Sequence, residues 1–287
     1  IRDYYASRGL GDVYKRQVGN LLNNAISMTQ FAATMAASMG IPAPKAGGAP
    51  FSMLGETMKH QGLSTAKRVL IYNPDAVGMW LFQKYTTWFA PVLRHTQLGV
   101  PIRTVMPSVT PVCFGTMYTG VEPAVHGIQK YEKHLLKQES LFDCLAAAGK
   151  KTALVAVADS SMAVLFQERE GIDYYILPYD GEVTDKAVAL IQEGSYEVVV
   201  VYNQEYDDVM HRTFPESEES LQALKNHIAA FDRLCTAAEE SWDTEDSLVV
   251  WATDHGIHTN ENGHGAHGSD LEEDLNVMHF FGAWKGL

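Results

Sequence analysis

The sequence predicts an α/β fold with a mostly parallel central sheet and helices on both faces. Short segments such as "RVLIYN" at 68–73 and "EVVVVYN" at 197–203 are almost entirely apolar and do not alternate with polar residues. Segments of helical length separate them. Strands that are buried on both faces and joined by helices are typical of parallel sheets. A chain of 287 residues, 46% of them hydrophobic, is long enough to build such a core.

The N-terminal part is interpreted separately from the rest. Residues 1–17 have no apolar periodicity, and "GDVYKRQ" resembles translated adapter sequence at the ends of metagenomic reading frames, so we expect this segment not to be native. Residues 18–66 are expected to form a helix over 19–40, ending at Gly40, and then a loop that starts with a run of prolines and glycines. The native start is then expected to be missing, and the C-terminus to be truncated.

The main domain is expected over residues 67–287, where strands and helices alternate. Expected strands lie at 68–73, 100–105, 152–158, 173–177, 197–203, 247–253 and 277–282. Expected helices lie at 79–93, 139–149, 160–170, 184–194 and 216–241. Because ligands of parallel sheets bind beyond the carboxyl ends of the strands, we expect the polar residues that follow the strands to converge.

Charge and cysteine content limit the classes of partner. The chain has 35 acidic and 22 basic residues, a net charge of -13, which disfavours a broad nucleic-acid footprint. A phosphate-bearing partner would have to be held locally, for instance by bound metal. The three cysteines, Cys113, Cys144 and Cys235, match neither a disulfide framework nor a zinc ribbon, so a reducing, cytoplasmic location is expected. No apolar run is long enough to predict a membrane span, and the oligomeric state is left open.

The residues that follow the strands offer carboxylates, imidazoles and one hydroxyl. They are Asp75, Thr110, Asp207, His211, Asp254 and His255. Carboxylates and imidazoles together suit zinc or manganese better than calcium, which prefers oxygen ligands. A helix would place Asp207 and His211 on one face, because they are four residues apart. Each aspartate alone is better explained as a turn or helix-cap residue, and only their convergence favours a metal site.

Thr110 is expected to be the N-cap of a helix, with Pro111 at the first helical position. In the simplest interpretation it is only a cap. The start of a helix also favours an anion, because free N–H groups and the helix dipole meet there. A threonine hydroxyl bound to a divalent metal could lose its proton and attack phosphorus.

Five motifs resemble the alkaline phosphatase superfamily, in its nucleotide pyrophosphatase/phosphodiesterase and phosphonoacetate hydrolase branch. In chain order they are "NPDAVG", "MPSVTPVCFGTMYTGVEPAVHGI", "DDVMH", "TDHG" and "GAHG". The resemblance spans roughly residues 67–287 and implies a catalytic domain built as a three-layer sandwich. It implies one metal ion bound by Asp207, His211 and His267. It implies a second ion bound by Asp75, Asp254 and His255, with Thr110 as a further ligand and as the nucleophile.

The resemblance implies a hydrolase with two divalent ions, zinc or else manganese or iron, that acts through a phosphothreonine intermediate. Its partner would be a small phosphodiester, nucleotide pyrophosphate or phosphonate and not a nucleic-acid polymer. "CFGT" lacks the sulfatase sequence C-x-P-x-R, and nothing between Gly120 and Glu197 has the size of a mutase cap. The alternatives are a phosphomonoesterase or phosphotransferase on the same site, or a metal-binding homologue with impaired catalysis.

Cys113 departs from the pattern of this family, which often has an asparagine three residues after the threonine, where its amide binds a phosphoryl oxygen. A thiol is a weaker donor, so the substrate contact expected at Cys113 would differ. Cys113 is also explained simply as a small buried apolar residue.

The stretch "TDHGIHTNENGHGAHG" at 253–268 contains four histidines. His255 follows a buried strand and belongs to the candidate site, and the family match favours His267 for the other ion. The spacing alone does not exclude His264 in place of His267, and His258 is expected to face solvent. Residues at the two ends of this loop are therefore expected to bind two different ions, and the glycines between them would let the chain fold back.

Overall fold

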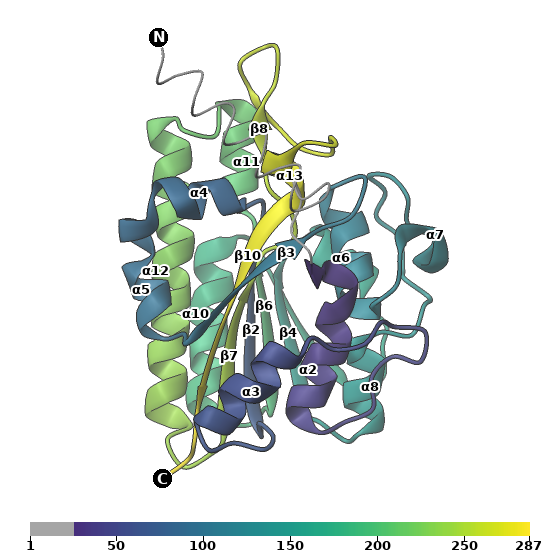
Figure 1. The fold of residues 1–287 in the computed structure, drawn as a ribbon, viewed down its shortest axis with the longest axis vertical. Coiled ribbons are helices and arrows are strands. Elements are labelled where there is room, and N and C mark those ends of the chain that lie inside the picture. Colours follow the sequence, from purple (N-terminus) through teal and green to yellow (C-terminus); the bar gives the residue numbers. More distant parts are fainter. Residues whose placement is uncertain (1–25) are drawn as a thin grey trace, which may run out of the picture.

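A computed structural model describes residues 26–287 and confirms the α/β fold (Figure 1). The described part contains an eight-stranded sheet of order β1-β3-β10-β7-β2-β6-β4-β5 and a small two-stranded sheet of β8 and β9. Neighbouring strands of the large sheet are parallel except at β10, which runs antiparallel to both β3 and β7. The strands are β1 Ile26–Ser27, β2 Arg68–Pro74, β3 Leu98–Arg103, β4 Thr152–Val157, β5 Ile172–Leu177, β6 Val198–Asn203, β7 Ser247–Ala252, β8 His258–Thr259, β9 Gly265–Ala266 and β10 Asn276–Trp284.

Helices cover both faces of the sheet (Figure 1). The α-helices are α2 Phe31–Met39, α3 Ser52–His60, α4 Met79–Lys84, α5 Ala90–Arg94, α6 Thr110–Thr119, α7 Pro123–His126, α8 Leu141–Ala147, α9 Ser161–Leu165, α10 Asp180–Glu193, α11 Glu205–Arg212, α12 Glu218–Ser241 and α13 Glu272–Leu275. Two 3₁₀-helices are η1 Met28–Gln30 and η2 Thr86–Phe89. Helices α10 and α12 lie on one face, whereas α2, α6 and α8 lie on the other.

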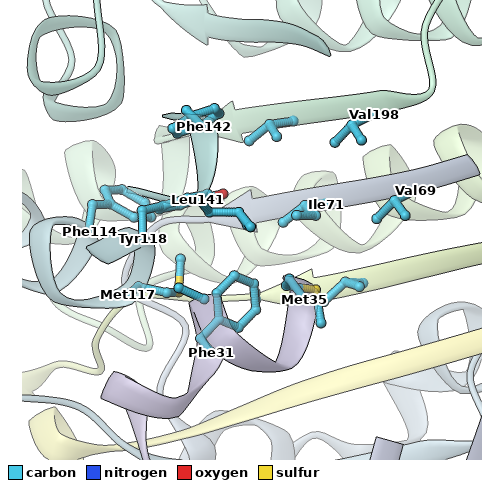
Figure 2. Packing of buried hydrophobic residues seen from close by; sticks show 14 of the residues in the cluster. Phe31, Met35, Val69, Ile71, Phe114, Met117, Tyr118, Leu141, Phe142 and Val198 are labelled. Atoms are coloured by element: carbon cyan, nitrogen blue, oxygen red, sulfur yellow. The ribbon is translucent and has the colours of Figure 1, made fainter. Parts of the chain in front are cut away.

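The two faces of the sheet carry separate hydrophobic clusters. Alternate residues of β2 point to opposite faces, so Val69 and Ile71 join the cluster under α2 and α6, while Tyr72 joins the cluster under α12. Figure 2 shows side chains of this cluster, among them Val69 and Ile71 of β2, Phe31 of α2 and Phe114 of α6. Burial on both faces explains why the central strands read as continuous apolar runs and not as alternating ones.

The seven strands predicted in the main domain all form, with ends shifted by up to about two residues, as is usual for boundaries. The long helix expected at 79–93 is wrong, because the chain forms α4, η2 and α5 in its place. Pro91, in the first turn of α5, has no N–H to continue a helix and would clash with the preceding turn. The segment between Gly120 and Glu197 contains short helices, α10 and two strands of the main sheet, so the expectation of no large cap is confirmed.

The N-terminal prediction is partly wrong. The segment expected not to be native and the start of the expected helix lie outside the described residues. The helix ends at Gly40 as predicted, with φ of 68°, but it begins only at Phe31. Ile26 pairs with Ile102 of β3, so tertiary pairing outweighs helical propensity there. The expected loop that follows contains α3.

The carboxyl ends of β2, β6 and β7 lie at one end of the sheet, close to α11, α13 and β8 (Figure 1). Within the described residues, no helix combines the length and the apolar character needed to cross a bilayer.

Candidate metal centre

The predicted site residues converge beyond the carboxyl ends of the central strands. Asp75 follows β2, Asp254 and His255 follow β7, and α11 begins two residues after β6. The structure brings together all the predicted ligands in two adjoining groups. The first group is Asp207, His211 and His267, and the second group is Asp75, Asp254 and His255 with the hydroxyl of Thr110.

The first group has the spacing of a tetrahedral metal site. Asp207 Oδ1 lies 3.4 Å from Nε2 of both His211 and His267, and the two Nε2 atoms are 3.1 Å apart. Zinc bonds of about 2.0–2.1 Å in tetrahedral geometry put ligand atoms about 3.3 Å apart. The three atoms therefore have the spacing of three corners of such a tetrahedron.

The second group converges on His255. Its Nε2 atom lies 3.4 Å from Asp75 Oδ1, 3.4 Å from Asp254 Oδ2 and 3.2 Å from Thr110 Oγ1. Ligand atoms of Asp75, Asp207 and His255 lie within 4.8 Å of one another. Asp207 is thus close to ligands of both groups, and the two groups lie side by side.

Backbone carbonyls set the tautomer of all three histidines. The Nδ1 atoms of His211, His255 and His267 lie 3.2, 3.0 and 2.9 Å from the carbonyl oxygens of Gly265, Gly256 and Ser108. Because a carbonyl can only accept, each Nδ1 donates its proton there, and Nε2 of the neutral ring keeps a lone pair. Two such lone pairs face each other between His211 and His267, an arrangement that a cation between them stabilises.

Within residues 26–287, three buried carboxylate oxygens have no hydrogen-bond partner: Asp75 Oδ1, Asp207 Oδ1 and Asp254 Oδ2. They are the same atoms that face the imidazoles. The other oxygen of Asp75 accepts from the hydroxyl of Tyr202, and that of Asp254 accepts from the N–H of Ala76 at 3.2 Å. Burying an unpaired charge costs several kcal/mol, and a cation bound between these oxygens would offset that cost. Carboxylates and neutral imidazoles in this arrangement fit two divalent cations.

Burial and neighbouring charges shift the pKa values of the site residues in both directions. The hydrogen bond to Asp207 raises the pKa of His211. Burial and the nearby charges of Asp254 and Asp207 raise the pKa of Asp75 well above its usual range. Burial alone would raise the pKa of Asp207, but His211, His267 and His255 outweigh it and lower the pKa. Burial, with His255 beside it, lowers the pKa of His267 to about 3 and keeps that ring neutral.

Local backbone geometry brings these side chains together. Ala76 has a φ of 62°, which is rare for a residue with a side chain and costs of order 1–3 kcal/mol. This conformation follows Asp75 directly and accompanies the bond from the Ala76 N–H to Asp254. A Cβ on Gly265 would lie 2.5 Å from the carbonyl oxygen of Met210, so only glycine lets the loop approach α11 closely enough for His267 to reach Asp207.

Thr110 does not cap the helix, contrary to the sequence prediction. Val109 is the N-cap of α6, and Thr110 is its first residue. The N–H of Cys113 donates to the carbonyl of Val109 at 3.0 Å, so the first intrahelical bond of α6 begins at Val109. The Thr110 hydroxyl is buried and faces His255 Nε2. This hydroxyl is therefore available to the metal site.

Cys113 is fully buried, and its Sγ atom lies 3.0 Å from the hydroxyl oxygen of Thr104. Burial raises the pKa of the thiol well above its usual range. This environment agrees with the interpretation of Cys113 as a small buried residue. Contact between Cys113 and a substrate stays a prediction.

The remaining histidines of the loop lie apart from the two groups. His264 is exposed, and its Nδ1 atom lies 3.1 Å from the carbonyl oxygen of Thr213. The geometry favours His267 over His264 as the ligand. The expectation that His258 faces solvent is wrong, because its Nδ1 lies 2.8 Å from Oδ1 of the fully buried Asp274.

Two supporting residues were missed by the sequence reasoning. Tyr202 holds Asp75, and Asp274 holds His258. A tyrosine that follows four valines near the end of β6 was an available signal for Tyr202. Asp274 gave no such signal, because it lies in a run of acidic residues that reads as a solvated helix start.

Comparisons with known proteins show the family of the chain and structures of similar fold. A family model described as type I phosphodiesterase / nucleotide pyrophosphatase matches residues 73–284. Phosphonoacetate hydrolase from Sinorhizobium meliloti 1021 has a similar structure, with a TM-score of 0.54 and 14% identity over 69% of this chain and 59% of that one. Murine ectonucleotide pyrophosphatase / phosphodiesterase 5 gives a TM-score of 0.53 and 16% identity over 68% and 59%.

A third similar structure is the C-terminal periplasmic domain of EcEptC from Escherichia coli in complex with zinc. Its TM-score is 0.50 and its identity 12%, over 77% of this chain and 73% of that one. At these identities the likeness shows the fold alone, and the chain spans 59% of the length of the first two structures. No curated protein sequence matches this one.

Proposed function

The chain belongs to the type I phosphodiesterase / nucleotide pyrophosphatase family, and from that premise we propose that it is a hydrolase of phosphodiesters, nucleotide pyrophosphates or phosphonates that uses two divalent metal ions. The observation that carries the proposal is the set of three unpartnered, buried carboxylate oxygens that face neutral imidazoles in two adjoining groups. Pairs of metal ions about 3.5–4 Å apart are a recurring solution for displacement at phosphorus.

Each group would hold one ion. Asp207, His211 and His267 would bind the first ion, and Asp75, Asp254 and His255 would bind the second, with Thr110 beside it. When bound, the ions supply positive charge that neutralises the phosphoryl oxygens and lowers the pKa of a nearby hydroxyl. Zinc suits this mixture of carboxylate and imidazole, with manganese or iron as alternatives.

Thr110 is the proposed nucleophile. It begins α6, where the helix dipole favours an anion, and its hydroxyl lies among the second group. As the bond from Oγ1 to phosphorus forms, the bond from phosphorus to the leaving group breaks, and the hydroxyl proton passes to solvent. Water then attacks the phosphothreonine, which releases the product and returns the hydroxyl. A threonine-to-alanine variant of the murine neighbour, in complex with AMP, is described as inactive.

The charges of the site favour a diester over a monoester. Two divalent ions bring +4 and the three carboxylates of Asp75, Asp207 and Asp254 bring -3, which leaves +1 before attack, while the histidines are neutral and the Thr110 hydroxyl keeps its proton. A phosphodiester, with one negative charge, neutralises this remainder. A phosphomonoester dianion leaves the site with a net charge of -1 by the same count.

The test is turnover by protein that has been stripped of metal and reloaded with zinc or manganese. We expect bis-p-nitrophenyl phosphate to be hydrolysed faster than p-nitrophenyl phosphate, and only after metal is restored. A clear preference for the monoester would favour the phosphomonoesterase or phosphotransferase alternative. Two bound ions without turnover of any ester would favour a catalytically impaired homologue.

A further inference from the structure

Asp274 connects the two ends of the histidine-rich loop. Its side chain is fully buried in α13, and each carboxylate oxygen takes a different partner. His258 Nδ1 lies 2.8 Å from Oδ1, and the N–H of Ser269 donates to Oδ2 at 2.9 Å. His258 is three residues after His255, and Ser269 is two residues after His267. The Asp274 carboxylate thus joins the segment that follows His255 of the second group to the segment that follows His267 of the first group.

The backbone of α13 is pressed against two further parts of the site. A Cβ on Gly256 would overlap with the carbonyl oxygen of Glu273, and one on Gly78 would lie 3.0 Å from the same oxygen. Gly256 directly follows His255, and its N–H donates to the Asp274 carbonyl at 2.8 Å. Gly78, three residues after Asp75, pairs with Val277 just beyond α13. Helix α13 and the residues next to it therefore contact the segments that follow Asp75, His255 and His267.

The two ends of the loop depend on Asp274 to different degrees. His255 follows β7, and its end of the loop also keeps the bond from Gly256 to the Asp274 backbone, which does not need the carboxylate. The other end, residues 265–269, is here called the His267 arm. It is held by the Asp274 carboxylate at Ser269 and by Ser108, which accepts from His267 Nδ1 and from the N–H of Gly268 at 3.2 Å. Gly265 and Ala266 also pair with β8, and the Gly265 N–H donates to the Thr213 carbonyl at 3.3 Å. Between the two ends, Asn260 to His264 form an exposed turn.

We infer that Asp274 is a positioning residue that fixes the His267 arm against α13 and thereby sets the metal affinity of the first group, while the second group is set by the sheet. The inference rests on the proposed metal function. Hydrogen bonds to a carboxylate are among the stronger ones, and groups that orient metal ligands typically change metal affinity by 10–100-fold when they are lost.

The experiment measures the zinc affinity of both sites by competition with a chelator, in the stripped full chain. We expect Asp274→Ala to weaken the first site by about 10–100-fold and to leave the second site within about threefold. The first site is identified as the one lost in His211→Ala. Asp274→Asn is the matched control, because its amide oxygen still accepts from Ser269 while its amide N–H₂ can donate to the other tautomer of His258. We expect Asp274→Asn to restore most of the affinity.

A second measurement is independent of metal. In the metal-free protein, Asp274→Ala is expected to speed amide hydrogen exchange in the His267 arm and to leave residues 247–252 of β7 unchanged. Equal weakening of both zinc sites, or faster exchange across both segments, would mean a general structural role and would overturn the inference. Native protein that binds fewer than two zinc ions would contradict the proposed function, whereas the exchange result would still decide the role of Asp274.

Discussion

The two ligand groups differ in how the fold places them. In the second group the side chains of Asp75, Asp254 and His255 are 2%, 0% and 0% exposed, and all follow central strands. In the first group Asp207 and His211 are 16% and 44% exposed on a short helix, and His267, which is 7% exposed, comes from a loop. Strand ends are fixed by the core, whereas helix and loop ligands need local supports. The second group is therefore a rigid part of the sheet, and the first group is assembled onto it.

The largest effect on turnover is expected when Thr110, whose hydroxyl faces the second group, is replaced. Thr110→Ala should lower turnover on the order of 10⁴-fold or more, as removal of a nucleophile does, because no other hydroxyl is assigned to attack phosphorus. The metal content should stay at two ions, since aspartates and histidines remain. Thr110→Ser, which keeps a hydroxyl, is the control and should retain far more activity. If Thr110→Ala keeps its turnover with both ions bound, the nucleophile is another group.

Removal of one histidine from each group tests the comparison directly. His255→Ala should lose the second ion and lower the free energy of unfolding of the metal-free protein by roughly 1–3 kcal/mol, because it opens a buried space beside two carboxylates. His211→Ala should lose the first ion but lower the free energy of unfolding of the metal-free protein by less than about 1 kcal/mol, because the side chain of His211 is partly exposed. Denaturant unfolding and metal analysis measure both. Equal losses of stability would contradict the distinction between the groups.

A smaller effect is expected from the tyrosine that supports the rigid group. Tyr202→Phe removes the hydroxyl that donates to Asp75 and should weaken the second zinc site by about 10–100-fold. Tyr206→Phe is the control, because that buried hydroxyl donates to the carbonyl of Pro215 at 3.0 Å and touches neither group. Chelator competition resolves the two sites. The role of Tyr202 would be refuted if both variants bound zinc like the native protein.

The difference between ligands at strand ends and ligands on a helix or loop also explains which site residues the sequence could predict. Asp75 and Asp254 were predictable because each follows an apolar run that can only be a buried strand. Only the family resemblance favours His267 over His264 in the sequence. The physical reason is a contact with Ser108, which is 159 residues away in sequence and accepts from His267 Nδ1, together with the close packing of Gly265 against α11. The sequence predicts Thr110 as the N-cap, whereas in the structure it is the first residue of α6. His258 was misjudged because its partner Asp274 lies in α13, outside the loop.

The most direct test of the two-ion site is anomalous diffraction at the zinc edge from crystals of the zinc-loaded protein. The account predicts two peaks. One should lie about 2.0–2.2 Å from ligand atoms of Asp207, His211 and His267, and the other at similar distances from Asp75, Asp254 and His255. A single peak shared by the two groups, or peaks away from these residues, would contradict it.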